Sequence, residues 1–187
     1  MERDARLMMN PFAIDKMLMA AGEVAGESKF VLVGSAAVIA WRPDVPVTMA
    51  MSVEIDIFAL SRDPDEVEVI LESNLGQGSS FHATHGRYID AVSPNTARLP
   101  DGWRDRALTL TTTNRKVTAL VPEPNDIAVS KLVRCLPRDL DFIVTGIAHG
   151  VFNLDAIVDR GRSLDISDLG QGSMAEKIEI LLGRLIR

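Results

Sequence analysis

The chain has 187 residues, of which 47% are hydrophobic and 25% are charged, and its formal net charge is −6. These values are typical of a globular protein and argue against an intrinsically disordered chain or one coated with basic surface. They do not exclude a local basic groove, because net charge says little about charge distribution. Cys135 is the single cysteine, which excludes an intrachain disulfide and a cysteine metal cluster.

We expect the protein to work in a reducing cytoplasm without a membrane partner. The opening Met1-Glu2-Arg3-Asp4 is not that of a signal peptide. The longest apolar run, from Phe30 to Trp41, is interrupted by Gly34-Ser35 and is too short to span a bilayer.

Hydrophobic spacing and turn residues predict an α/β (α+β) fold, with a mixed, twisted sheet and flanking helices. We expect the acidic strand described below to be central, with a hairpin that turns at His85-Gly86 and joins strands over 81–84 and 86–92. The other predicted strands are 29–33, 52–60, 107–112 and 116–120. The predicted helices are 11–25, 35–41, 63–75, one starting at Pro124, one starting near Pro137, 151–160 and 175–187. The change to helical spacing at Pro122 divides the chain into an α/β core (1–121) and a C-terminal helical subdomain that closes a cleft (122–187).

Two acidic residues share one face of the strand around Ser52 to Phe58. Side chains alternate along a strand, so Glu54 and Asp56 lie on one face, while Ile55 and Ile57 lie on the other. Like charges at neighbouring positions repel each other, and a cation between them explains the pattern. Hard divalent ions such as Mg²⁺ bind carboxylate oxygens and keep other positions for water and phosphates. Taken alone, the pattern is also typical of a solvated edge strand.

A Gly34-Ser35 turn separates the apolar strand before it from the helix after it. Such a turn offers backbone N–H groups, a hydroxyl and a helix N-terminus, which together suit a phosphate. The same turn is common in α/β proteins that bind no phosphate. Asp90 is a further acid inside an apolar strand and a candidate for the same site. The alternative interpretation is a structural carboxylate that is hydrogen-bonded at the edge of a loop.

The Gly-Ser turn followed by Glu54-Ile55-Asp56-Ile57 resembles the signature of the DNA-polymerase-β-like nucleotidyltransferase superfamily. A second tract, with Ser130-Lys131-Leu132 and then Arg138-Asp139-x-Asp141, resembles the helix pair of the bacterial branch related to abortive-infection, toxin-like nucleotidyltransferases. The resemblance covers about residues 28–143 and implies the nucleotidyltransferase fold.

The resemblance also implies the roles of the site residues. Gly34 and Ser35 would bind phosphate. The metal ligands and catalytic residues would be Glu54, Asp56 and, as a third acid, Asp90. Lys131 would contact the triphosphate, and Arg138 and Asp139 would complete the nucleotide site.

Two residues differ from the usual pattern: Val33 replaces a second glycine, and Glu54 replaces the commoner Asp, which lengthens that ligand arm. Without the resemblance, Lys131 is typical of a surface lysine, and Arg138-Asp139 of a solvated helix start.

We therefore expect a nucleotidyltransferase that uses Mg²⁺ or Mn²⁺ and a nucleoside triphosphate. It would transfer a nucleoside monophosphate to a hydroxyl on an RNA 3′ end, a protein or a small molecule. A toxin-like role with an antitoxin partner is part of what the resemblance implies. The alternatives are an inactive nucleotidyltransferase-fold module that binds partners in a toxin–antitoxin-type or regulatory complex, and a metal-dependent phosphohydrolase.

Overall fold

The structure is a computed structural model that describes residues 8–60, 63–169 and 171–186. The expectation about residues 1–4 and the last position of the predicted C-terminal helix, 187, lie outside the described residues.

The strands of the described residues form one mixed sheet in the order β3-β2-β1-β5-β4. Strand β2 pairs antiparallel with β1 and parallel with β3, and β5 pairs parallel with β1 and antiparallel with β4. The acidic strand β2 is therefore interior, but the middle position belongs to β1. The strands are β1 (Lys29–Val33), β2 (Glu54–Ala59), β3 (Tyr88–Ala91), β4 (Leu108–Thr111) and β5 (Thr118–Val121).

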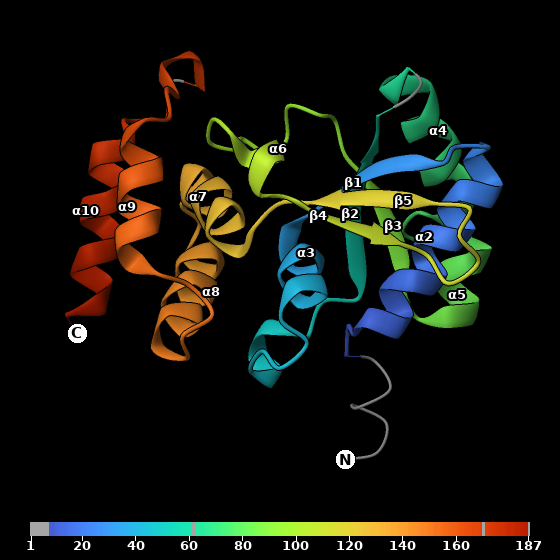
Figure 1. Ribbon diagram of the computed structural model, residues 1–187, viewed down its shortest axis with the longest axis horizontal. Helices are drawn as coiled ribbons and strands as arrows, with labels where there is room; N and C mark the ends of the chain where they lie inside the picture. The colour runs from blue at the N-terminus through green and yellow to red at the C-terminus, as the bar shows by residue number, and fades with distance from the viewer. Residues whose placement is uncertain (1–7, 61–62, 170, 187) are drawn as a thin grey trace.

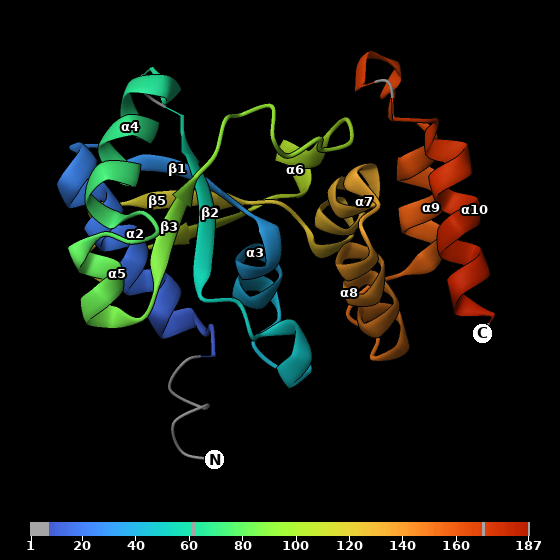
Figure 2. The same ribbon diagram turned by 180° about the vertical axis from the view of Figure 1, so that it is seen from behind.

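Helices lie on both sides of this sheet. In Figures 1 and 2, α2 (Pro11–Ala25), α4 (Pro64–Leu75) and α5 (Ser80–His85) gather on one side, and the C-terminal helices stand on the other. Helix α3 (Gly34–Trp41) lies between them and packs against β1, β2 and α7. The remaining elements are η1 (Val47–Met49), α6 (Trp103–Arg106), α7 (Pro124–Arg134), α8 (Pro137–Ala148), α9 (Leu154–Arg162), η2 (Ser167–Leu169) and α10 (Met174–Leu185).

Side-chain caps explain where several helices begin. The Asn10 side chain accepts a hydrogen bond from the N–H of Ala13 at the start of α2, and Asp63 caps α4 in the same way. Pro11 and Pro64 occupy the first turns, where a missing N–H costs nothing. These local signals are why the predicted helix starts agree with the structure.

The predicted hairpin around His85-Gly86 is wrong. Residues Ser80–His85 form the helix α5, because Ser79 caps its start by accepting from the N–H of His82. Gly86 ends it in the left-handed region, with φ of 66°. Strand β3 is real but runs parallel to β2, which places α4 and α5 in the crossover between the two strands.

The C-terminal helices share the hydrophobic core of the sheet. Buried side chains of α7, such as Ile127 and Leu132, belong to the same cluster as Phe30 of β1 and Leu181 of α10. The proposed division at 121/122 falls between β5 and α7 and stays a prediction. Among the described helices, none combines the length and apolar character needed to cross a membrane.

Candidate functional site

A polar cleft of about 300 Å³ lies where β1, β2 and β3 face α7 and α8. It is lined by every residue that the sequence singles out as a candidate ligand. These residues are Gly34, Ser35, Glu54, Asp56, Asp90, Lys131, Arg138 and Asp139. Val33, which occupies the usual position of a second glycine, also lines it. The fold thus brings segments about 100 residues apart into one cavity, whereas their individual roles remain predictions.

Carboxylates form one side of the cleft. Asp56 of β2 pairs in register with Asp90 of β3, and Glu54 lies two residues before Asp56 on the same face. Ile55 and Ile57, which alternate with these acids, are fully buried on the other face. The period-two prediction is therefore confirmed. Because β2 lies between β1 and β3, the solvated-edge alternative is wrong.

The acids act strongly on one another. The pKa of Asp56 is raised to about 6, chiefly by burial and further by the negative charges of Asp90 and Glu54. Burial likewise raises the pKa of Asp90, with contributions from the charges of Glu72 and Glu54. Placing negative charge here opposes folding, which is typical of a site built to hold a cation.

Gly34 marks the point where β1 ends and α3 begins. Its φ of 65° lies in the left-handed region, and an added Cβ would lie 2.8 Å from Cγ of Asp56. Ser35 follows in the first turn of α3 and lines the cleft. Among the described residues no side chain caps this helix, and the N–H groups of an uncapped helix start are suited to bind an anion.

Cations form the opposite side. The Lys131 side chain is only 13% exposed, with Nζ lying 3.8 Å from Oδ1 of Asp139 and 4.6 Å from the centre of the Phe142 ring. The surface-lysine alternative is therefore wrong. Burial lowers the pKa of Lys131, the charge of Arg134 adds to this effect, and the charges of Asp139 and Asp56 oppose it.

Asp139 is buried within this basic group. The side chain is 2% exposed, and its Oδ1 accepts a hydrogen bond of 2.6 Å from Nη2 of Arg134. Its Oδ2 is buried without a hydrogen-bond partner among the described residues. The solvated-helix-start alternative is thus wrong for Asp139, whereas Arg138 next to it is exposed at the cleft.

Sequence reasoning missed several residues of the cleft. Arg134 lies one turn after Lys131 on α7, and this spacing could have indicated a second cation on the same face. Phe142 lies one turn after Arg138 on α8. Three hydroxyls come from segments with no local signal; they belong to Thr48, Ser52 and Thr96. The hydroxyl of Ser130, next to Lys131 in the second tract, also lines the cleft.

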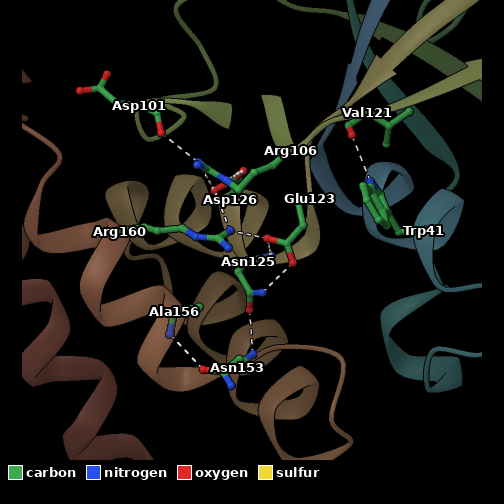
Figure 3. Close-up of polar contacts among 10 residues, drawn as sticks. All are labelled: Trp41, Asp101, Arg106, Val121, Glu123, Asn125, Asp126, Asn153, Ala156 and Arg160. Carbon is green, nitrogen blue, oxygen red and sulfur yellow. Dashed lines mark hydrogen bonds and ion pairs between the residues drawn. The ribbon is translucent and has the colours of Figure 1, made fainter. Parts of the chain in front are cut away.

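A buried ionic network holds the start of α7 in place (Figure 3). Asp126 is fully buried and accepts hydrogen bonds of 3.0 Å from Nε and Nη2 of Arg106. It also accepts one of 2.9 Å from Arg160 of α9, which pairs with Glu123 as well. Arg106 further donates to the carbonyl of Asp101. The network therefore connects α6, α7 and α9 with its charges balanced.

The polar contacts continue from this network toward α9. The Asn125 amide donates to Glu123, and its Oδ1 accepts a 2.7 Å hydrogen bond from the N–H of Asn153, which caps α9 (Figure 3). At the other end of α7, the buried Lys177 of α10 donates to the carbonyl of Val133. Both ends of the helix that carries Lys131 are thus fixed by later elements.

The acidic side fits a hard divalent ion by its donor chemistry. Glu54 and Asp56 offer carboxylate oxygens in one cavity, and the pKa of Asp56 is raised first by burial and then by the negative charges of Asp90 and Glu54. Among the described residues, no three His, Cys, Asp or Glu side chains converge into a cluster that could hold a metal ion. Mg²⁺ is usually held by one or two carboxylates together with water and substrate phosphates, so the pair is sufficient.

A family model described as "Nucleotidyltransferase of unknown function (DUF6036)" matches residues 10–163, which is most of the chain. The chain belongs to this nucleotidyltransferase family. The match runs from the start of α2 to the end of α9 and includes the whole cleft. No curated protein and no solved structure gave a significant match. Membership gives nucleotidyl transfer as the general activity and agrees with the mixed α/β fold.

Proposed function

We propose that this nucleotidyltransferase binds a nucleoside triphosphate across the cleft, with its phosphates between the two charged sides. The amides that start α3, the Ser35 hydroxyl and the Lys131 ammonium group bind the phosphate oxygens. Arg138 binds them from the cleft mouth. Glu54 and Asp56 would hold divalent cations on the acidic side, and Asp90, in register with Asp56 on β3, would add negative charge beside them.

One observation carries this proposal: opposite charges face each other across a single cavity. The charges of Lys131 and Arg134 act to lower the pKa of Asp56, although burial and the neighbouring acids have the larger effect and raise it overall. The two sides are thus close enough to act on each other. A triphosphate with bound cations has alternating charges of its own, which complement both sides.

In the proposed reaction, an acceptor hydroxyl oxygen forms a bond to the α-phosphorus. The bond from this phosphorus to the oxygen that bridges to the β-phosphate breaks. The products are the nucleotidylated acceptor and pyrophosphate, and the hydroxyl proton is released. Lys131 and the α3 amides stabilise the negative charge of the departing pyrophosphate. Bound Mg²⁺ or Mn²⁺ would supply further charge neutralisation at the phosphates. The acceptor belongs to one of three classes: an RNA 3′ end, a protein or a small molecule.

The test is an incubation of the protein with Mg²⁺, total RNA or cell extract, and triphosphates labelled at the α- or the γ-phosphate. We expect the α-label to become attached to an acceptor and the γ-label to leave as pyrophosphate. Asp56→Asn is expected to stop both. Release of labelled orthophosphate without transfer would instead favour a phosphohydrolase, and nucleotide binding without turnover would favour an inactive binding module in a toxin–antitoxin-type or regulatory complex.

A further inference from the structure

Tyr88 lies directly opposite Glu54 on the neighbouring strand. In the parallel pairing of β2 with β3, Glu54 is in register with Tyr88, and Asp56 with Asp90. Ile89 between the two β3 residues is fully buried, so Tyr88 and Asp90 share the face that carries the acids. Residues in register on one face have their Cβ atoms about 5 Å apart, which brings the phenol ring to the Glu54 side chain.

The ring of Tyr88 is supported from behind by α5. The His82 ring lies with its centroid 4.9 Å from that of Tyr88, at an interplanar angle of 54°. His82 is itself oriented, because its Nδ1 accepts a 3.0 Å hydrogen bond from the N–H of Gly78. The helix that replaces the predicted hairpin therefore supplies a fixed support for the tyrosine.

The Tyr88 hydroxyl can serve as a donor to Glu54. A phenol has an ordinary pKa of about 10, so the hydroxyl is protonated at neutral pH. It can therefore donate a hydrogen bond to the Glu54 carboxylate, which lies opposite it in the strand register.

We propose that Tyr88 is a positioning residue that orients the Glu54 carboxylate for cation binding. This inference rests on the proposed function, in which Glu54 is a metal ligand. Glu has one more rotatable bond than the Asp that is commoner at this position, and a ligand with more rotamers loses more conformational entropy when it is fixed. A hydrogen bond from a supported phenol holds the longer arm in place. Such outer partners of metal-binding carboxylates commonly change metal affinity when they are removed.

Tyr88→Phe tests this role because it removes the hydroxyl and keeps the ring against His82. We expect the melting temperature without metal to stay close to that of the wild type. The Mg²⁺ concentration for half-maximal nucleotide binding should rise about 10-fold or more. In the Glu54→Asp background, which shortens the arm by one CH₂ group, we expect the hydrogen bond to be lost and Tyr88→Phe to add little. Equal effects of Tyr88→Phe in both backgrounds would overturn the proposal.

The chain offers a direct probe, because Tyr88 is its only tyrosine. Fluorotyrosine incorporated in place of tyrosine gives a single fluorine resonance from this position. Addition of Mg²⁺ should shift this resonance in the wild type and leave it unchanged in Glu54→Gln.

The same titrations separate this inference from the proposed function. If Asp56→Asn and Glu54→Gln abolish the Mg²⁺ dependence while Tyr88→Phe leaves it unaltered, the positioning role is wrong and the metal site stands. If all three variants keep the wild-type Mg²⁺ dependence, the metal site fails, and the positioning role fails with it.

Discussion

Gly34 is in direct contact with the Asp56 carboxylate. A Cβ built on Gly34 would lie 2.8 Å from Cγ of Asp56, closer than real Cβ atoms approach another atom, and still nearer to Oδ2. The Gly34-Ser35 turn and the acidic strand are therefore packed directly against each other at the cleft. Glycine is required here by the acid as well as by the positive φ.

Gly34→Ala should therefore abolish metal-dependent nucleotide binding, because Asp56 must rotate away to make room. The matched control is Gly26→Ala, where φ is 66° and nothing lies within 4 Å of an added Cβ. Each substitution places alanine in the left-handed region, at a cost of about 1–2 kcal/mol. Thermal melts and nucleotide titrations should show similar destabilisation in both variants and lost binding in Gly34→Ala alone. Retained binding in a folded Gly34→Ala protein would contradict the contact's importance.

Stability without metal should depend on pH through Asp56. Its pKa is about 6 in the folded protein against an ordinary value of 3.8, so between these values the folded state binds more protons than the unfolded state. The free energy of unfolding therefore falls as pH rises through this window. The shift of about two pKa units corresponds to a change on the order of 3 kcal/mol.

Asp56→Asn should accordingly raise the melting temperature in EDTA at about pH 7.5 and change it little at about pH 4. For the wild type, the affinity for Mg²⁺ should increase as pH rises toward about 6 and level off above it, because protons compete for the carboxylate below its pKa. A flat pH dependence of the difference between the two proteins would show that Asp56 is not the group responsible.

Lys131→Met should weaken binding of triphosphate more than binding of monophosphate. Methionine keeps the side-chain length against Phe142 but removes charge-assisted contacts worth about 1.5–3 kcal/mol each, which corresponds to about 10-fold or more in affinity. Lys116→Met, an exposed change outside the cleft, controls for the loss of one positive charge. If both variants lose affinity equally and only at low salt, the effect is long-range electrostatics rather than contact.

Arg134 and Arg138 should differ in their effect on stability although both line the cleft. Among the described residues, Arg134→Ala leaves the buried Asp139 with Lys131, at 3.8 Å, as its remaining ion-pair partner. We expect the free energy of unfolding to fall by about 1–3 kcal/mol. Arg138→Ala should change it by no more than about 0.5 kcal/mol. Adding Asp139→Asn to Arg134→Ala should recover part of the loss in a urea melt. Equal destabilisation by the two arginine variants would argue against the Asp139 pair.

The parts of the fold that rest on local signals could be predicted from the sequence. Asn10 and Asp63 cap helices, and alternation along Glu54–Ala59 places the acids on one face. Residues 81–85 are ambiguous in the sequence, because so short a segment can form a strand or a helix. The Ser79 cap, just before the segment, favours the helix.

The sequence motifs predicted which residues line the candidate site. They did not predict which of these residues are buried. Lys131 and Asp139 are residue types that usually lie at the surface. The packing of α7 and α8 nevertheless leaves both side chains largely buried. The sequence around Asp126 does not indicate that it is buried in an ionic network, because its partners Arg106 and Arg160 lie 20 and 34 residues away. Such pairs depend on how helices pack together, which no spacing rule for one element contains.

The supports at the two ends of α7 tie completion of the cleft to the end of synthesis. A ribosome makes Gly34, Glu54 and Asp90 before the helix that carries Lys131, and the supports Arg160 and Lys177 come later still. Domains generally fold as units, and the C-terminal helices share one hydrophobic core with the sheet. We therefore expect the nascent protein to complete its cleft only after the last helix has left the ribosome.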